Sequence, residues 1–312
     1  MFKKNSASYE GAPAIIVTGL GDYSLGDTME CGQCFRYERV PREGAAEYVT
    51  VVGSNLIRVI QERRGELIFP EMTDEVFESV VRPYFNLDTD LDTVRADVIA
   101  HTDSEWLKSA AEFASGIAIL RQEPWETLAS FIISQNNNIP RIRKIIREIS
   151  AQYGECLSLE NDNNSCPLRL IDGKPSEDVC KACGRCYTFP SAAEILERPE
   201  GLLPSKPGFR YAYILDAAEK VASGEVNLEE ISAAASYEYT LESLKKIKGV
   251  GDKVASCAAL FGFRNYEAFP IDVWMKRAID TYFNGHLDPS TLGKYAGVAQ
   301  QYIFHYIRNT EK

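Results

Sequence analysis

The chain has 312 residues, of which 45% are hydrophobic and 25% are charged, and its formal net charge is −11. This length allows two or three domains with a sizeable core, and the composition excludes a disordered chain. No apolar run approaches the roughly 20 residues of a membrane span, and no apolar segment follows the N-terminal MFKKNSASYEGAP. We therefore expect a cytoplasmic protein without membrane contact, nucleoid-associated if prokaryotic, and a monomer.

The negative charge argues mildly against a nucleic-acid partner, because phosphate contacts are normally made by basic surfaces. It does not exclude one, since a local patch can differ in sign from the whole chain. The segment from Leu241 to Lys253 holds four lysines against Glu242 and Asp252, a local charge of 4 − 2 = +2.

The first 70 residues contain short runs rich in β-branched residues, separated by glycine, asparagine and charged turns. Such runs predict an antiparallel sheet, and here they are AIIVTG, EYVTVVG, NLIRVIQ and ELIF. From Thr73 the periodicity is helical to the end, apart from an insert at about residues 155–188. The sequence predicts an α+β protein with a sheet domain and flanking helices over residues 1–112 and a helical region over 113–312.

Three short stretches, each taken alone, predict only ordinary structural elements. SQNNNIPRIR, from Ser134 to Arg143, ends an apolar helix with consecutive asparagines, which favour a connection between helices. The stretch 208–210 reads as a turn with an exposed aromatic residue, and the stretch 32–36 reads as the start of a strand.

The insert contains four cysteines with the spacing C-x13-C-x2-C-x2-C, namely Cys166, Cys180, Cys183 and Cys186. Four thiolates suit a tetrahedral structural zinc ion, whose binding would stabilise an insert with few apolar residues. An iron–sulfur cluster is one alternative, although the Cys-Pro that often follows such a motif is absent. Thiols without a metal, or disulfides, are the other alternative.

The segment from Leu241 to Asp272 predicts a helix, a glycine hairpin, a second helix and a loop that ends in an acid. Gly249 and Gly251 interrupt the helical periodicity, and Asp252 stands at the expected N-cap of the next helix. Lys253 then falls in the first helical turn, where the helix dipole favours a neutral amine over an ammonium. A neutral amine is the form that a nucleophile needs.

Six motifs together give the chain a resemblance to the 8-oxoguanine DNA glycosylase/AP lyases of the helix–hairpin–helix glycosylase superfamily. In chain order they are GQCFRY from Gly32, NNNIPRI from Asn136, GFR from Gly208, GVGDKVASC from Gly249, PIDV from Pro270 and AQQYIF from Ala299. The resemblance covers nearly the whole chain. It implies a TATA-binding-protein-like antiparallel sheet domain, followed by all-helical helix–hairpin–helix glycosylase domains.

The resemblance implies base-excision repair of double-stranded DNA, with removal of 8-oxoguanine opposite cytosine and no cofactor for catalysis. Lys253 would attack C1′ and form a Schiff base, which leads to AP lyase activity by β-elimination. Asp272, placed like an N-cap before VWMKRAI, would stabilise positive charge at C1′ and help to move protons. The alternatives are a related glycosylase for another base, and a non-catalytic DNA-binding protein in which Lys253 contacts phosphate.

The resemblance also implies a pocket for a base that is flipped out of the duplex. Cys257 and Phe304 would flank the base and Gln300 would read its Watson–Crick edge. The Gly32 carbonyl would accept from N7–H, a donor that 8-oxoguanine has and guanine lacks. On helical periodicity alone, these residues have other roles: Phe304 is a core aromatic residue, Cys257 a buried apolar one and Gln300 a surface one.

Other residues would contact the DNA itself. Asn136 would fill the vacated stack, and Arg141 and Arg210 would bind the orphaned cytosine. Phe209, where the family more often has tyrosine, would wedge against a base step. In the hairpin, backbone amides of Gly249, Val250 and Gly251 would bind a phosphate, and carbonyls of Lys245, Ile247 and Val250 could hold a monovalent or divalent cation.

Two residues depart from the family pattern. Trp274 follows the acid where a phosphate-contacting histidine is usual, and Ile307 replaces an aspartate that would orient that histidine. We expect Trp274 to pack locally or to donate its indole N–H to a phosphate.

Overall fold

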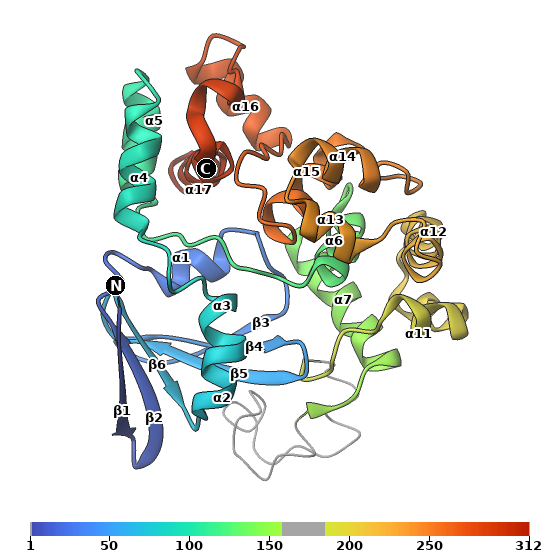
Figure 1. Ribbon diagram of the computed structural model, residues 1–312, viewed down its shortest axis with the longest axis horizontal. Helices are drawn as coiled ribbons and strands as arrows, with labels where there is room; N and C mark the ends of the chain where they lie inside the picture. Colours follow the sequence, from blue (N-terminus) through green and yellow to red (C-terminus); the bar gives the residue numbers. More distant parts are fainter. Residues whose placement is uncertain (1, 158–184, 312) are drawn as a thin grey trace.

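A computed structural model describes residues 2–157 and 185–311 of the chain. An antiparallel sheet lies at one end of the molecule and helices occupy the rest (Figure 1). In the described part of the chain, no helix has the length and apolar character needed to cross a membrane.

The sheet has six strands in the order β1-β2-β6-β5-β4-β3, and each neighbouring pair is antiparallel. The strands are β1 (Lys3–Tyr9), β2 (Ala12–Thr18), β3 (Tyr37–Val40), β4 (Ala46–Val52), β5 (Asn55–Gln61) and β6 (Glu66–Pro70). The four predicted runs correspond to β2, β4, β5 and β6, so the antiparallel sheet is confirmed. The two strands missed by the sequence pattern, β1 and β3, are the edges of the sheet, where less burial leaves a weaker apolar signal.

Short helices cover one face of the sheet, and two longer ones lead away from it. They are α1 (Leu25–Glu30), α2 (Asp74–Val76), the π-helix η1 (Phe77–Val81), α3 (Arg82–Tyr84), α4 (Leu91–Ala100) and α5 (Glu105–Phe113). Phe77 and Phe85 pack on Phe69 of β6, with ring centroids 5.8 and 5.6 Å away. Helices α4 and α5 pack instead against α17 (Ala296–Thr310) at the C-terminal end. The boundary at residues 112 and 113 stays a prediction.

The remaining described helices form a second core. They are α6 (Pro124–Ser134), α7 (Ile139–Tyr153), α11 (Ala192–Glu197), the 3₁₀ helix η2 (Pro199–Ser205), α12 (Arg210–Ala222), α13 (Leu228–Ala234), α14 (Tyr237–Leu244), α15 (Asp252–Phe261), α16 (Val273–Tyr282), the 3₁₀ helix η3 (Pro289–Tyr295) and α17. Helix α15 packs between α6 and α14, and α16 packs on α17. The predicted α+β class is confirmed.

The loop that carries Gly32 is held between the two parts of the molecule. The fully buried Gln33 donates through Nε2 to the carbonyls of Thr28 and Ala118, at 2.8 and 2.9 Å. Its Oε1 accepts from the Leu120 amide at 2.8 Å. Gln33 therefore uses its side-chain amide to fix the backbone next to Gly32.

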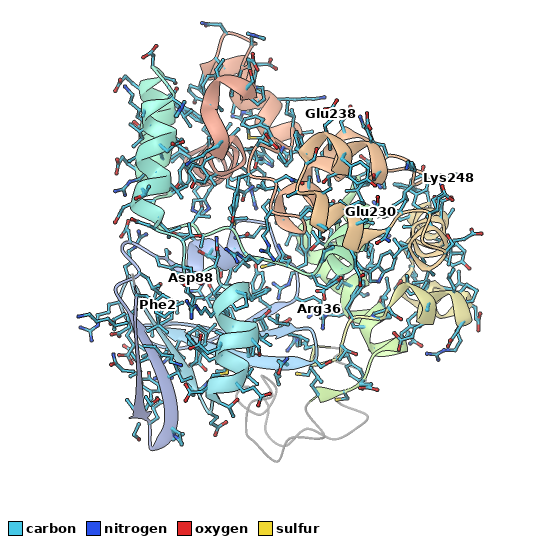
Figure 2. The ribbon with its side chains drawn as sticks, viewed as in Figure 1. Phe2, Arg36, Asp88, Glu230, Glu238 and Lys248 are labelled. Carbon is cyan, nitrogen blue, oxygen red and sulfur yellow. The ribbon has the colours of Figure 1, made fainter. Side chains whose placement is uncertain are left out.

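An ion pair also crosses from this loop to the helical region. Arg36, which lies between the sheet and the helices in Figure 2, donates through one terminal nitrogen to Glu126 of α6 at 2.9 Å. The Arg36 side chain is 7% exposed. This pair holds the start of β3 against the helix that ends at the candidate site.

Candidate active site

The glycine hairpin joins α14 to α15 as predicted, but its capping differs from the prediction. Gly251 is the N-cap of α15 and Asp252 is the first helical residue, so the expected N-cap at Asp252 is wrong. The Asp252 carboxylate instead forms an ion pair with Lys245 across the hairpin. Lys253 remains in the first turn of α15.

Of the two hairpin glycines, Gly249 occupies a position that only glycine fits without strain, and Gly251 does not. Gly249 has φ of +79°, and a Cβ there would lie 2.3 Å from the Tyr213 ring of α12. Gly251 has an ordinary φ of −98°, with no atom within 4 Å of a Cβ. The sharp turn therefore depends on Gly249, while Gly251 leaves its amide at an open surface.

We predict that Gly249→Ala destabilises the protein by about 1–3 kcal/mol, because the new methyl group meets an aromatic ring at a strained φ. Gly251→Ala is the matched control and should cost less, about 0.5–1 kcal/mol, because alanine is a poorer N-cap than glycine but meets no neighbouring atom. Chemical denaturation of the two variants measures the difference. Equal stability of both variants would contradict this role for Gly249.

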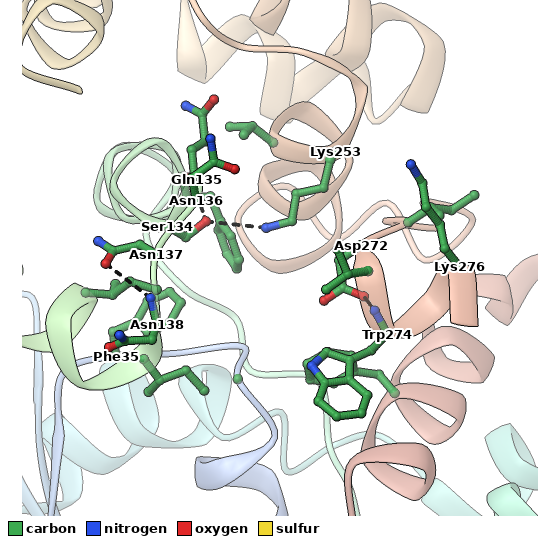
Figure 3. A pocket seen from close by; sticks show the side chains of 18 of the residues that line it. Phe35, Ser134, Gln135, Asn136, Asn137, Asn138, Lys253, Asp272, Trp274 and Lys276 are labelled. Atoms are coloured by element: carbon green, nitrogen blue, oxygen red, sulfur yellow. Dashed lines mark hydrogen bonds between the residues drawn. The ribbon is translucent and has the colours of Figure 1, made fainter. Parts of the chain in front are cut away.

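Lys253 points its amine into a cavity of about 690 Å³ (Figure 3). Nζ donates to Ser134 Oγ at 3.3 Å and lies 5.3 Å from the centre of the Phe131 ring. Both partners belong to α6, the helix that packs on α15. The amine is thus held between a hydroxyl and an aromatic face.

Asp272 caps α16, as the sequence predicts. Its Oδ1 accepts from the Trp274 and Met275 amides at 3.0 and 2.9 Å. In the described residues, nothing donates a hydrogen bond to Oδ2. The cap fixes the carboxylate at the wall of the cavity that also holds Lys253 (Figure 3).

The residues predicted for the base pocket lie together with the two reactive groups. Gly32, Cys257, Gln300 and Phe304 line a narrower cavity of about 60 Å³, which Lys253 and Asp272 line as well. Gly32 has φ of +87°, and a Cβ there would lie 3.4 Å from the edge of the Phe304 ring.

The burial of two pocket residues is informative. Gln300 is only 3% exposed, so the surface position that periodicity alone predicts for it is wrong. Cys257 is 4% exposed, and burial raises the pKa of its thiol to about 11. Cys257 therefore presents a protonated thiol at neutral pH, which suits packing against a ligand rather than nucleophilic attack.

The residues predicted to contact the orphaned base line a separate, open cavity of about 610 Å³. It is lined by Asn136, Asn137, Asn138, Arg141, Phe209 and Arg210. Asn136 has φ of +46° and lines both this cavity and the one that holds Lys253. Phe209 is 51% exposed and packs edge-on against Tyr213, beside the hairpin glycine Gly249.

The two arginines of this cavity are not equivalent. Arg210 is 4% exposed and donates to the Gln135, Asn136 and Pro207 carbonyls. Burial, and then the charge of Arg141, lower the pKa of Arg210 below its usual value. Arg141 is exposed and donates only to the Lys206 carbonyl, at 3.3 Å, among the described residues. To reach a base, Arg210 would have to break its hydrogen bonds to residues 135–138, here called the asparagine loop, whereas Arg141 would not.

Cations around these cavities lack acidic partners within the described ranges, although the chain as a whole is acidic. They are Arg141, Arg210, Lys253, Lys276 and Arg308. Among described residues, Asp272 is the one acid that lines the two larger cavities. The site therefore carries local positive charge, which is what a phosphate backbone requires.

Among the residues that line the cavities without a role predicted from the sequence are Ser134, Lys276, Gln301 and Arg308. A signal for Arg308 was present, because it follows Phe304 by four residues and so shares its helix face. The guanidinium of Arg308 lies 5.1 Å from the centre of the Phe304 ring. Ser134 and Lys276 gave no such signal, because their proximity comes from the packing of α6, α15 and α16.

At the two positions that depart from the family pattern, Ile307 lies in the helical core and Trp274 packs against it. Ile307 is fully buried, and Trp274 is half-buried with the Arg277 guanidinium 5.8 Å from its ring. Trp274 therefore packs locally, as one of the two expectations has it, and it also lines the cavity that holds Lys253. A contact between its indole N–H and a phosphate stays a prediction.

Most of the predicted metal site lies outside the described residues. Cys166, Cys180 and Cys183 fall there, while Cys186 is described and buried, next to a β-bridge between Cys156 and Tyr187. Within residues 2–157 and 185–311, no group of three His, Cys, Asp or Glu side chains could hold a metal ion. Zinc binding stays a prediction, as does the cation at the hairpin carbonyls.

Known proteins resemble this chain in sequence and fold. The family model for the N-terminal domain of 8-oxoguanine DNA glycosylase matches residues 15–128. A yeast (Saccharomyces cerevisiae) N-glycosylase/DNA lyase is 29% identical over 282 residues, which are 81% of this chain and 66% of the yeast protein.

Two solved structures match nearly the whole chain or all of it. MBOgg1, in complex with a low-affinity DNA ligand, is 33% identical with a TM-score of 0.81, over 99% of this chain and 100% of that one. The 8-oxoguanine glycosylase/lyase of Clostridium acetobutylicum, bound to double-stranded DNA with cytosine opposite 8-oxoG, is 30% identical with a TM-score of 0.81, over 100% and 99%. This chain therefore belongs to the 8-oxoguanine DNA glycosylase/lyase family.

Proposed function

We propose that this protein excises 8-oxoguanine from duplex DNA opposite cytosine and then cleaves the strand by β-elimination. The proposal rests above all on the placement of Lys253 and Asp272 at one cavity, which narrows into a pocket lined by Gln300 and Phe304. An amine, a carboxylate and a pocket for a planar ligand are what a lyase-type glycosylase needs.

The chemistry assigned to these groups is a substitution at C1′. The amine of Lys253 forms a bond to C1′ while the bond from C1′ to the base breaks, and the base leaves with its electron pair and gains a proton. The Asp272 carboxylate faces the positive charge that develops on the sugar. Loss of the amine proton and opening of the sugar ring, whose oxygen gains a proton, give a Schiff base at C1′. Removal of a proton from C2′ then forms a C2′–C3′ double bond as the C3′–O bond breaks and the 3′ phosphate leaves.

Recognition of the lesion requires that the nucleotide leave the duplex. We assign the flipped base to the pocket between Cys257 and Phe304, with the Gly32 carbonyl facing N7–H. The position of Asn136 between the two larger cavities supports its role in filling the vacated stack. The exposure of Arg141 supports its contact with the orphaned cytosine, with Arg210 as the second donor after release from the asparagine loop.

A strand-cleavage assay on matched duplexes, run with and without a final alkali treatment that cuts abasic sites, tests this function. The duplexes carry 8-oxoguanine opposite cytosine, 8-oxoguanine opposite adenine, guanine opposite cytosine, and 3-methyladenine opposite thymine. We expect cleavage at 8-oxoguanine opposite cytosine to be the fastest by a wide margin. Preference for the methylated base would favour a glycosylase of another specificity, and binding without cleavage would favour a non-catalytic DNA-binding protein.

Duplex binding should depend on Arg308, which lines the cavity that holds Lys253. Its guanidinium has no acidic partner among the described residues and is therefore available to a phosphate. We predict that Arg308→Gln reduces the slope of log K against log salt by about 0.9, the value for one phosphate contact. Lys294→Gln is the matched control: Lys294 also lies over an aromatic ring, 4.9 Å from the centre of Tyr295, but lines none of the cavities described above. Equal slopes for the two variants would contradict the contact.

We propose further that Cys166, Cys180, Cys183 and Cys186 hold a structural zinc ion, and that the hairpin carbonyls can accept a cation bridging to DNA. The buried position of Cys186 supports the first of these. Metal analysis of protein purified without added metal or chelator measures the zinc content, and we expect one zinc ion per chain. A cytoplasmic location also remains a proposal.

A further inference from the structure

Two adjacent glutamines of α17 line the narrow cavity. Gln300 and Gln301 are 3% and 4% exposed, and both contact the space beside Cys257 and Phe304. The family resemblance gives Gln300 a role as reader of the base and gives Gln301 none. Neighbouring residues of a helix point about 100° apart, so a shared wall for both side chains is unusual.

The two side-chain amides are joined by a hydrogen bond, and among the described residues one amide oxygen of the pair has no hydrogen-bond partner. Gln301 Nε2 donates to Gln300 Oε1 at 2.7 Å. Gln301 Oε1 is buried without a hydrogen-bond partner in the described part of the chain. An unpartnered buried oxygen lowers stability, and an apolar side chain of the same size would avoid that loss. Stability alone therefore does not account for a glutamine at this position.

The bond fixes which atom of the Gln300 amide faces the ligand. With Oε1 turned to Gln301, Nε2 remains as a donor, and Oε1 keeps one lone pair for a second acceptor role. A guanine-type edge offers a carbonyl at C6 and a donor at N1, which match these two groups. An adenine-type edge offers an amino donor at C6 and a bare acceptor at N1, which match the reversed amide.

We infer that Gln301 is a positioning residue that sets the direction of the Gln300 amide and thereby makes the pocket select guanine-type over adenine-type oxidised purines. The inference rests on the proposed excision of 8-oxoguanine. The Gly32 carbonyl cannot make this distinction, because 8-oxoguanine and 8-oxoadenine both carry a donor at N7.

The test compares 8-oxoguanine and 8-oxoadenine, each placed opposite cytosine in the same duplex sequence. Single-turnover excision rates are measured for the wild type and for Gln301→Met, which keeps a similar volume without the amide. We expect the preference for 8-oxoguanine to fall about tenfold in the variant, as for the loss of about one oriented hydrogen bond. The melting temperature should not fall.

A second variant, Gln301→Glu, keeps the shape but reverses the polarity. At pH 8.5 an ionised carboxylate only accepts hydrogen bonds, so it would turn Nε2 of Gln300 away from the ligand. The preference should then fall further than in Gln301→Met.

Two outcomes overturn the inference. One is an unchanged preference in both variants, and the other is an equal loss of activity on both bases with a lower melting temperature, which would assign Gln301 to packing. If the wild type itself leaves 8-oxoguanine in place, the proposed function fails instead.

Discussion

Replacement of Lys253 by glutamine should lower the rate of base excision by about 10⁴-fold or more, because the nucleophile itself is removed. The amide has a similar length but cannot form a Schiff base. Strand cleavage after base loss should disappear with it. Single-turnover assays on duplex DNA with 8-oxoguanine opposite cytosine measure both steps.

Lys276→Gln supplies the matched control for this variant. Lys276 lines the same cavity, is exposed and carries the same charge, but lies outside the hairpin. Its loss should weaken duplex binding and leave the single-turnover rate at saturating enzyme within about tenfold of the wild type. A Lys253→Gln protein that excises within tenfold of the wild type, with an unchanged melting temperature, would contradict the nucleophile assignment.

Asp272 should show the second largest effect, and two substitutions separate its two roles. Asparagine caps a helix as well as aspartate does, so Asp272→Asn should retain the bonds to the Trp274 and Met275 amides. It removes the negative charge that faces C1′, and we expect excision to fall by about 10²- to 10³-fold. Thermal unfolding should be nearly unchanged.

Asp272→Ala removes the cap together with the charge. Activity should fall as far as in Asp272→Asn. The free energy of unfolding should be lower than that of Asp272→Asn by about 0.5–2 kcal/mol, because the cap is lost. Paired kinetic and denaturation measurements on both variants make the comparison. Wild-type activity in Asp272→Asn would show that the residue acts only as a cap.

Local chemistry made much of the site predictable from the sequence. The hairpin and the cap at Asp272 depend on residues close together in the chain, where spacing determines geometry. The pocket residues were expected from the family resemblance that the six motifs carry. The edge strands β1 and β3 lacked that advantage, because a half-exposed strand has little apolar alternation to detect.

The errors came from contacts between distant segments. Gln300 looks like a surface residue on periodicity alone, but its helix α17 is packed on α16, η3 and α5, so few of its faces reach solvent. The N-cap at Gly251 rather than Asp252 is a second such case, since the Asp252 carboxylate pairs with Lys245 across the hairpin instead of capping α15.

The hydrogen bonds of Arg210 in the free protein were also not predictable from the sequence. The family resemblance implies a DNA contact for Arg210, yet its guanidinium donates to the carbonyls of Gln135 and Asn136. These bonds couple the arginine to the loop that carries Asn136. No spacing rule gives such a contact, because it joins α12 to the end of α6 across the fold.

Borohydride trapping tests the central assignment most directly. Wild-type protein is mixed with a duplex that carries 8-oxoguanine opposite cytosine, reduced during the reaction, digested and mapped by mass spectrometry. We predict a covalent adduct between the sugar and the peptide that contains Lys253. Base release without any adduct, or an adduct on another amine, would contradict the account.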